Sequence, residues 1–211
     1  MLYNPPAFRV EDADLLHAHI DQSGLAMLVT NGEEGPLVSH VPLLLDRAKG
    51  PRGTLLGHLA KPNLQWQISD VAADALAVFP GPDAYIRPSW YATKREHGRV
   101  VPTWNYTVVH ARGRLEFFED AGRLREAVER LTNQREGNRD APWAVSDAPE
   151  RYVQAQLKAI VGFELEIKSL EGKHKLSQNR PTADKELVVE GLGEAGETVM
   201  KGLVQAAIDK G

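Results

Sequence analysis

The sequence predicts a mainly β fold, a small barrel with added helices. About seven short segments rich in β-branched and aromatic residues are separated by glycine, proline and asparagine turn signals. Two longer helical patterns are inserted late in the chain, after most of these segments. Many short strands with few helices are typical of an antiparallel barrel.

The first half of the chain contains four expected strands. A helix over residues 12–22 precedes them, with Asp12 able to cap its start. The strands are expected at residues 25–30, 37–45, 54–59 and 75–79. The first two form a hairpin whose turn opens at Asn31. A further helix is expected from Pro62, with Leu64 and Ile68 on one face.

The second half continues the barrel and adds helices. A turn is expected at residues 81–83, and a bend at Gly113 in a long strand. Strands are expected at 84–91, 101–118 and 161–170, helices at 120–134 and 149–159, and a charged loop at 95–99. We therefore predict a barrel domain with inserted helices over residues 1–170. A polar loop at 173–181 and a short helical tail would make up residues 171–211.

Composition limits the classes of function. The 211 residues are 42% hydrophobic and 26% charged, without an apolar run long enough to span a membrane. There is no cysteine, which fits a reducing cytoplasm and excludes disulfides and thiolate chemistry. The formal net charge of −4 does not favour DNA binding, although DNA stays possible. No catalytic motif or metal-ligand spacing is present, so catalytic residues are unknown and no metal is expected.

Aromatic and polar residues are concentrated between residues 84 and 113. Their mixture suits a flat, conjugated ligand with polar edges, such as a flavin, stacked on rings and hydrogen-bonded at its rim. A well-packed barrel corner explains the same residues equally well. The candidate ligand contacts here are Trp90, Tyr91, Lys94, Thr103 and Asn105. Of the neighbouring positions, we expect Trp104 to face the core or a dimer partner.

A second candidate region follows the strand at residues 54–59. A junction between a strand and a helix can hold an anion, because free backbone N–H groups and the helix dipole meet there. Lys61 and Asn63 are the side chains placed to help, although a solvated lysine is the more common interpretation of Lys61. His58 is either a ligand contact or a hydrogen-bonded core histidine.

The segment from residue 173 to 181 has no core periodicity and combines two lysines, an arginine and short polar groups. A surface loop is the ordinary interpretation. The alternative is a polar edge of the ligand site, which would bring Ser177, Gln178 and Asn179 close to Asn105.

The order of several motifs resembles the PaiB-type FMN-binding split-barrel proteins, the "negative transcriptional regulator" family. The matching segments are Y-N-P-P-A-F, S-H-V-P-L-L-L, G-H-L-A-K-P-N, F-P-G-P-D-A-Y-I-R-P-S-W-Y, V-P-T-W-N-Y-T-V-V-H and G-K-H-K-L-S-Q-N-R. The resemblance extends to about Leu192 and implies a Greek-key split β-barrel. It also implies a homodimer with FMN at the subunit interface and the FMN phosphate near Lys61.

The resemblance leaves the biochemical role open. A PaiB-type FMN-binding regulator is the first hypothesis, and a flavin-dependent oxidoreductase of the same fold is the alternative. A haem-associated protein of related fold, with a histidine ligand, is a third.

Overall fold

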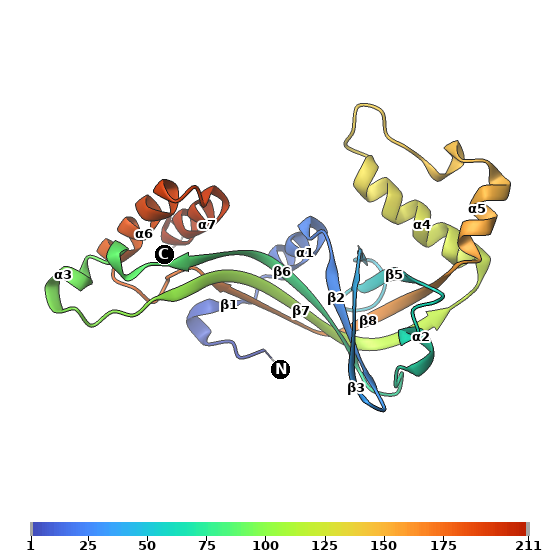
Figure 1. Ribbon diagram of the computed structural model, residues 1–211, viewed down its shortest axis with the longest axis horizontal. Helices are drawn as coiled ribbons and strands as arrows, with labels where there is room; N and C mark the ends of the chain where they lie inside the picture. Colours follow the sequence, from blue (N-terminus) through green and yellow to red (C-terminus); the bar gives the residue numbers. More distant parts are fainter. Residues whose placement is uncertain (1, 210–211) are drawn as a thin grey trace. The chain divides into compact units, whose positions relative to one another are not determined.

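The computed structural model describes residues 2–209 and contains a mainly antiparallel β-sheet with added helices (Figure 1). The strands are β1 (Arg9–Val10), β2 (Ala26–Gly32), β3 (Gly35–Val41), β4 (Leu44–Asp46), β5 (Thr54–Ala60), β6 (Ala75–Ile86), β7 (Thr103–Phe118) and β8 (Ile160–Lys175). Their order is β3-β2-β6-β7-β8-β5-β4, and β1 pairs with β8. The fold class is the predicted one.

The helices are α1 (Ala13–Gln22), α2 (Gln65–Ile68), α3 (Thr93–His97), α4 (Ala121–Glu136), α5 (Glu150–Leu157), α6 (Thr182–Glu194) and α7 (Thr198–Asp209). Short 3-10 helices occur at Pro6–Phe8, Pro88–Trp90 and Val145–Asp147. Within residues 2–209, none of the helices is both long enough and apolar enough to cross a membrane.

The chain forms two compact units, each built from separated segments. The terminal unit contains the described residues of 1–16, 80–109 and 171–211. The central unit contains residues 17–79 and 110–170. Residues 171–211 are expected to form a C-terminal part. Of these, residues 171–209 belong to one compact unit with residues 80–109, and residues 210–211 lie outside the described range.

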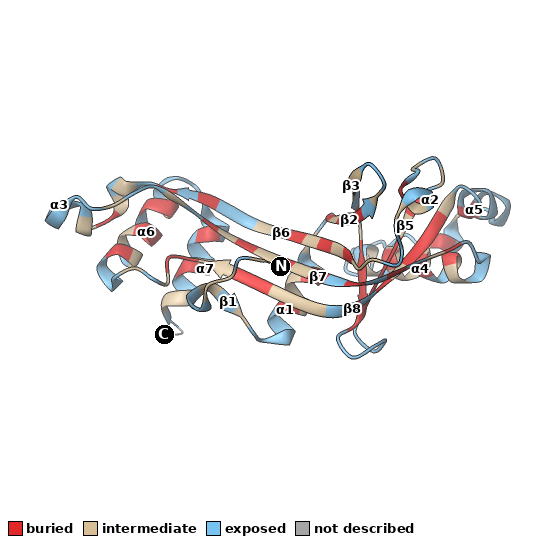
Figure 2. Cartoon of the chain, turned by 90° about the horizontal axis from the view of Figure 1, so that it is seen from below, coloured by how far each residue is buried: buried red, intermediate tan, exposed pale blue. Residues whose placement is uncertain are grey.

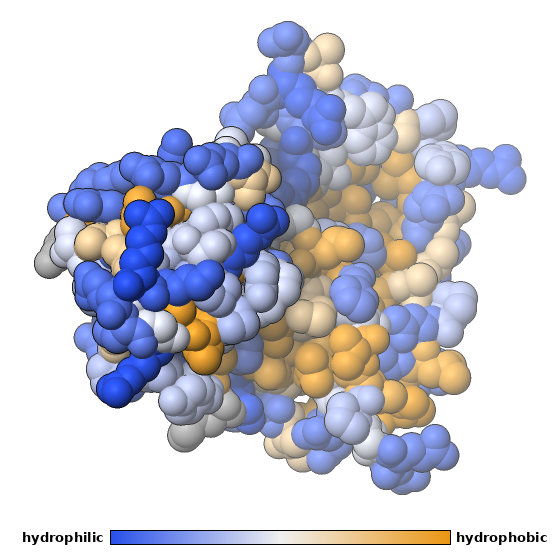
Figure 3. Space-filling view, turned by 60° about the vertical axis from the view of Figure 1, so that its left-hand side comes forward, coloured by the Kyte–Doolittle hydropathy of each residue, from blue (hydrophilic) through white to orange (hydrophobic). Residues whose placement is uncertain are grey.

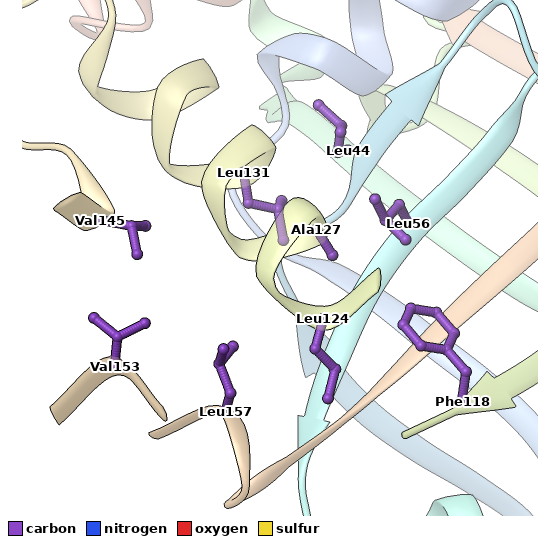
Figure 4. Packing of buried hydrophobic residues seen from close by; sticks show 9 residues of the cluster. All are labelled: Leu44, Leu56, Phe118, Leu124, Ala127, Leu131, Val145, Val153 and Leu157. Atoms are coloured by element: carbon purple, nitrogen blue, oxygen red, sulfur yellow. The ribbon is translucent and has the colours of Figure 1, made fainter. Parts of the chain in front are cut away.

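The central unit packs helices onto strands. Its hairpin pairs β2 with β3 from Ala26 opposite Val41 to Gly32 opposite Gly35. Helices α4 and α5 cover an apolar cluster against β4 and β5, in which Leu124, Ala127 and Leu131 of α4 face the sheet (Figure 4). The cluster consists of Leu44, Leu56, Phe118, Leu124, Ala127, Leu131, Val145, Val153 and Leu157. The predicted cap of α4 is confirmed, because the Asp120 carboxylate accepts a hydrogen bond from the Arg123 N–H at 2.9 Å.

The terminal unit has its own core beneath α6 and α7. Ala84, Ile86, Tyr91, Leu176, Val188, Val189, Leu192, Met200 and Val204 form it. Buried residues alternate with more exposed ones along β7, where Asn105 and Thr107 are buried and Trp104 is exposed. Figure 2 shows a similar change between buried and less buried residues along β6. This period of two places neighbouring side chains on opposite faces of the strand.

Several expected elements differ from the structure. Helix α2 is a single turn, in which Gln65 is buried while Leu64 and Ile68 are exposed, because the Gln65 amide bonds the Leu28 carbonyl and the Thr30 hydroxyl. The turn predicted at 81–83 and the loop predicted at 95–99 are also wrong.

Strand β6 continues without interruption through residues 81–83. Its pairing with β2 covers only Leu76–Val78, so the missing N–H groups of Pro80 and Pro82 break no hydrogen bond on that side. The charged loop instead forms most of α3, which ends at Gly98 with a positive φ of 68°. Strand β8 extends to Lys175, five residues beyond its predicted end.

Candidate functional site

The terminal unit brings the start of β7 and the segment after β8 together. The Asn105 side-chain amide donates to the Ser177 hydroxyl at 3.0 Å, and that hydroxyl lies 3.2 Å from the Asn105 carbonyl oxygen. Both residues are buried. Ser177 is the only described non-glycine residue with a positive φ, 65°, and this backbone conformation directs its hydroxyl to Asn105. Asn105 and the K-L-S-Q-N segment are therefore neighbours, as predicted.

Gln178 holds this segment in place rather than projecting from it. Its side-chain oxygen accepts from the Leu176 N–H at 2.7 Å, and its side-chain nitrogen donates to the His174 carbonyl at 2.6 Å. Asn179 and Lys94 are exposed on the surface of the same unit. Direct contact of these residues with a flavin stays a prediction.

Two lysines lie on one side of the end of β8. The Lys175 ammonium donates to the Thr103 hydroxyl and, at 2.8 Å, to the Trp104 carbonyl. Lys173 is only 5% exposed, and its ammonium donates to the Tyr3 carbonyl at 2.9 Å. Neither lysine makes an ion pair with a carboxylate within residues 2–209. Partial burial, followed by the charges of Lys173 and Arg180, lowers the pKa of Lys175.

Aromatic rings lie beside these lysines. Trp104 is 52% exposed and Tyr85 43% exposed, and the two rings meet edge to face with centroids 5.7 Å apart. The Lys173 ammonium lies 5.2 Å from the Tyr106 ring centroid. We call Tyr85, Trp104 and Tyr106 the aromatic face. Of the two alternatives predicted for Trp104, the core is wrong, because the side chain is exposed and alternates with buried Asn105 in β7, and a dimer partner stays a prediction.

Two predicted ligand contacts serve the core of the terminal unit. Tyr91 is 1% exposed, burial raises the pKa of its hydroxyl, and the Arg180 guanidinium lies 4.4 Å above its ring. Trp90 packs flat on α6 at Gly191, where an added Cβ would lie 2.4 Å from the indole. Thr93 binds the buried carboxylate of Asp184 through its N–H and hydroxyl.

The other three candidates lie in the central unit. Lys61 forms an ion pair with Glu119 at 2.6 Å. The Asn63 amide donates to the Ser39 hydroxyl at 2.8 Å, and its oxygen accepts from the Gln65 N–H at 3.0 Å. Because α2 has only one turn, the strand-to-helix junction lacks the extended helix that the predicted anion site requires.

His58 lines a cavity of about 330 Å³ under α4, together with Leu131, Arg135 and Trp143. Its Nδ1 is buried without a hydrogen-bond partner, and burial lowers the pKa of the imidazole. The interpretation of His58 as a hydrogen-bonded core histidine therefore does not describe this nitrogen.

Comparison with known proteins identifies the family. Residues 2–169 match the family model described as "Putative FMN-binding domain". The chain belongs to this family. A curated relative, "Protease synthase and sporulation protein PAI 2" of Bacillus subtilis, is 32% identical over 209 residues, covering 99% of this chain and 98% of the relative. The resemblance to the PaiB-type proteins is thus confirmed.

Solved structures of low sequence identity share the fold of this FMN-binding-domain family member. The conserved hypothetical protein Rv2991 from Mycobacterium tuberculosis aligns with a TM-score of 0.59 at 11% identity, over 85% of this chain and 94% of that one. The FAD and heme binding protein from Mycobacterium smegmatis aligns with a TM-score of 0.56 at 14% identity, over 79% and 73%. These similarities support the predicted split-barrel fold.

Sequence reasoning missed part of this region. It did not select Tyr85, Lys173, Lys175 or Arg180 as candidates. The spacing of the two lysines, two residues apart, would have placed them on one face of a strand. That signal was missed because the segment from residue 173 was expected to be a loop.

Proposed function

We propose that this protein binds a flavin, specifically FMN, on the aromatic face of the terminal unit. The observation that carries the proposal is the exposed Tyr85–Trp104 pair beside two lysines that have no carboxylate partner. A flat conjugated ring can stack on exposed aromatic side chains, and neighbouring donors can bind its polar edge. The FMN-binding family supports this choice of ligand.

The chain's own residues fit such a ligand in chemical type. The aromatic face offers ring surface, and Lys175 and Thr103 offer donors at its edge. Asn105, Ser177 and Gln178 are hydrogen-bonded to one another or to the backbone, so they fix the segment that carries Lys175. A bound flavin would supply redox chemistry, while these residues orient it and balance its charge.

We propose regulation of the PaiB type as the biological role, supported by membership of the family and the similarity to PAI 2. A flavin-dependent oxidoreductase is the second candidate. It is favoured by the exposure of Tyr85 and Trp104, because a ring bound there would stay accessible to a second reactant.

Absorbance of the purified protein tests the ligand class first. Bound flavin gives bands in the blue and near ultraviolet, whereas haem gives a Soret band. Titration of flavin fluorescence with the protein then gives the FMN affinity. Trp104→Ala should weaken FMN binding by about tenfold, since an aromatic contact contributes about 0.5–1.5 kcal/mol beyond buried area.

The matched control is Tyr152→Ala, which removes a ring of 58% exposure from α5 of the central unit. This variant should keep the wild-type FMN affinity. Equal affinity in the Trp104→Ala and Tyr152→Ala variants, or no flavin binding by the wild type, would contradict the proposed site.

A further inference from the structure

Lys173 and Lys175 lie at the end of β8, and the positive charge of Arg180, five residues later, acts on Lys175. Lys173 and Lys175 donate only to carbonyl or hydroxyl oxygens, and Arg180 lies over the ring of Tyr91. In the part of the chain that the structure describes, no ion pair involves any of the three. By contrast, the cations of the central unit are widely paired, as Lys49 and Arg123 are with Glu164.

The burial of Lys173 increases the free-energy cost of this excess of positive charge. A charged group removed from water is unfavourable unless it is paired and hydrogen-bonded. The ammonium has one hydrogen bond at 2.9 Å and two ring faces at 5.1 and 5.2 Å, which compensate it only in part. Lys175 and Arg180 add further positive charge to the same segment.

No buried acid of this unit forms an ion pair with these cations in the described residues. Asp184 is the only buried carboxylate in the described residues, and both of its oxygens accept hydrogen bonds from Thr93, at 2.9 and 2.8 Å. The structure therefore has a cationic cluster in which an external anion would replace repulsion between like charges with attraction.

We propose that Lys175 and Arg180, with Lys173 behind them, form a binding site for a phosphate dianion. An ammonium and a guanidinium both match phosphate oxygens, and Arg180 can bind two oxygens at once. A dianion suits three positive charges better than a carboxylate does. This site differs from Lys61, whose charge is already balanced by Glu119 at 2.6 Å.

The phosphate can come from two sources that the same chemistry would recognise. One is free inorganic phosphate, and the other is the phosphate of a bound flavin mononucleotide on the adjacent aromatic face. The site itself does not depend on flavin binding, so the two proposals can fail separately.

The first arm of the test uses inorganic phosphate. Thermal unfolding and phosphorus NMR are measured over a phosphate series at constant ionic strength set with chloride. The wild type should show saturable binding and a rise in melting temperature. Lys175→Gln and Arg180→Gln should each weaken binding about ten- to a hundredfold. Lys175→Arg, which keeps the charge, should retain it and shows that the site folds.

Two further variants are controls in this arm. Lys201→Gln removes an exposed lysine of α7 in the same unit, and Lys61→Gln removes the alternative phosphate contact. Both should bind phosphate as the wild type does. Absence of saturable phosphate binding in the wild type, or its loss in Lys61→Gln instead of Lys175→Gln, would overturn the proposal.

The second arm compares FMN with riboflavin, which lacks the phosphate. If the flavin phosphate occupies the site, the wild type should prefer FMN and Lys175→Gln should lose that preference. Phosphate binding at Lys175 with no flavin binding would leave this inference standing and overturn the proposed function. Flavin binding that depends on Trp104, without phosphate binding at Lys175 in either arm, would overturn this inference and leave the proposed function standing. A preference for FMN that is lost in Lys61→Gln but unchanged in Lys175→Gln would overturn the proposed flavin position, and the first arm would then decide this inference alone.

Discussion

Asn105 is a buried amide whose main structural role is to bind Ser177. Its side chain is 0% exposed and both of its polar atoms contact the Ser177 hydroxyl. Asn105→Ala would leave that hydroxyl buried without these contacts, which should lower the free energy of unfolding by about 1–3 kcal/mol. Urea denaturation measures this change.

Ser177→Ala should cost a similar amount, and Asn179→Ala, at an exposed position two residues away, should stay within about 0.5 kcal/mol of wild type. The sequence alone gives a different expectation, in which Asn105 is a ligand contact rather than a stabilising core residue. Wild-type stability of Asn105→Ala would restore that expectation.

His58 should make stability depend on pH. Burial lowers the pKa of its imidazole, so the unfolded chain takes up a proton below about pH 6.5 that the folded protein resists. The contribution of His58 is fully present above that pH and is lost as the pH falls, with a slope of at most about 1.4 kcal/mol per pH unit. His58→Gln should lose less stability than wild type between pH 7.5 and 5.5 in urea unfolding.

Some pH dependence should remain in His58→Gln, because burial also lowers the pKa of His19. The measurement therefore compares how steeply stability changes with pH in wild type and in His58→Gln. Arg135 and Glu136, which also line the His58 cavity, are the same in both proteins. Identical slopes in the two proteins would show that His58 is protonated equally in the folded and unfolded states.

At the scale of elements, β7 and β8 lie very close together at Gly113. A Cβ at this position would lie 1.8 Å from the Glu166 carbonyl oxygen, which belongs to the backbone and cannot rotate away. Gly113→Ala should lower the free energy of unfolding by about 3 kcal/mol or more, or prevent folding. The sequence predicted a bend here, and the structure gives close strand contact as the reason for glycine.

Gly202→Ala in α7 is the matched control for this substitution. No atom lies within 4 Å of a Cβ there, so alanine should stabilise the helix by about 0.5–1 kcal/mol. Opposite signs for the two variants in denaturant unfolding are expected, and a mild effect of Gly113→Ala would mean that the strands can separate locally.

The sequence predicted elements correctly where a local signal, such as a capping side chain, marks their ends. It failed where contacts between residues distant in sequence determine the structure. Asp12 and Asp120 were correctly placed at the starts of α1 and α4, because a capping side chain acts within its own turn. Strand β6 continues to Ile86, well beyond its pairing with β2 at Leu76–Val78, and no local pattern contains its other neighbour, β7. Trp90 is covered by Gly191, a hundred residues later, so composition alone could not separate a core ring from a ligand contact.

For the whole molecule, we expect a homodimer. Apolar side chains are exposed in both units, and Figure 3 shows hydrophobic residues gathered on part of the visible surface. Examples of more than half exposure are Val38, Leu64 and Ile68 in the central unit and Val101 and Trp104 in the terminal unit. Light scattering at micromolar concentration should give twice the monomer mass, with an obligate interface burying about 2,000 Å² or more. A monomer would contradict this.

DNA binding, where it occurs, should be weak and driven by charge. The formal net charge of −4 gives little attraction overall, although Arg87, Lys94 and Arg95 lie close together in sequence near α3. Duplex DNA titrated at two salt concentrations should lose affinity steeply as salt increases. Tight binding to one DNA sequence, with an affinity that does not fall as salt increases, would show direct reading of bases.

The division of the terminal unit into three separated segments has a consequence for synthesis on the ribosome. Asn4 donates to the Gly172 carbonyl, and Arg9 pairs with Lys173, across more than 160 residues of sequence. Residues 4–9 are synthesised well before these partners and cannot make the contacts until more than 160 further residues have been added. The central unit needs nothing beyond residue 170, so its segments are complete earlier. Residues 4–9, although made before the central unit, therefore reach their folded contacts only after every segment of that unit has been made.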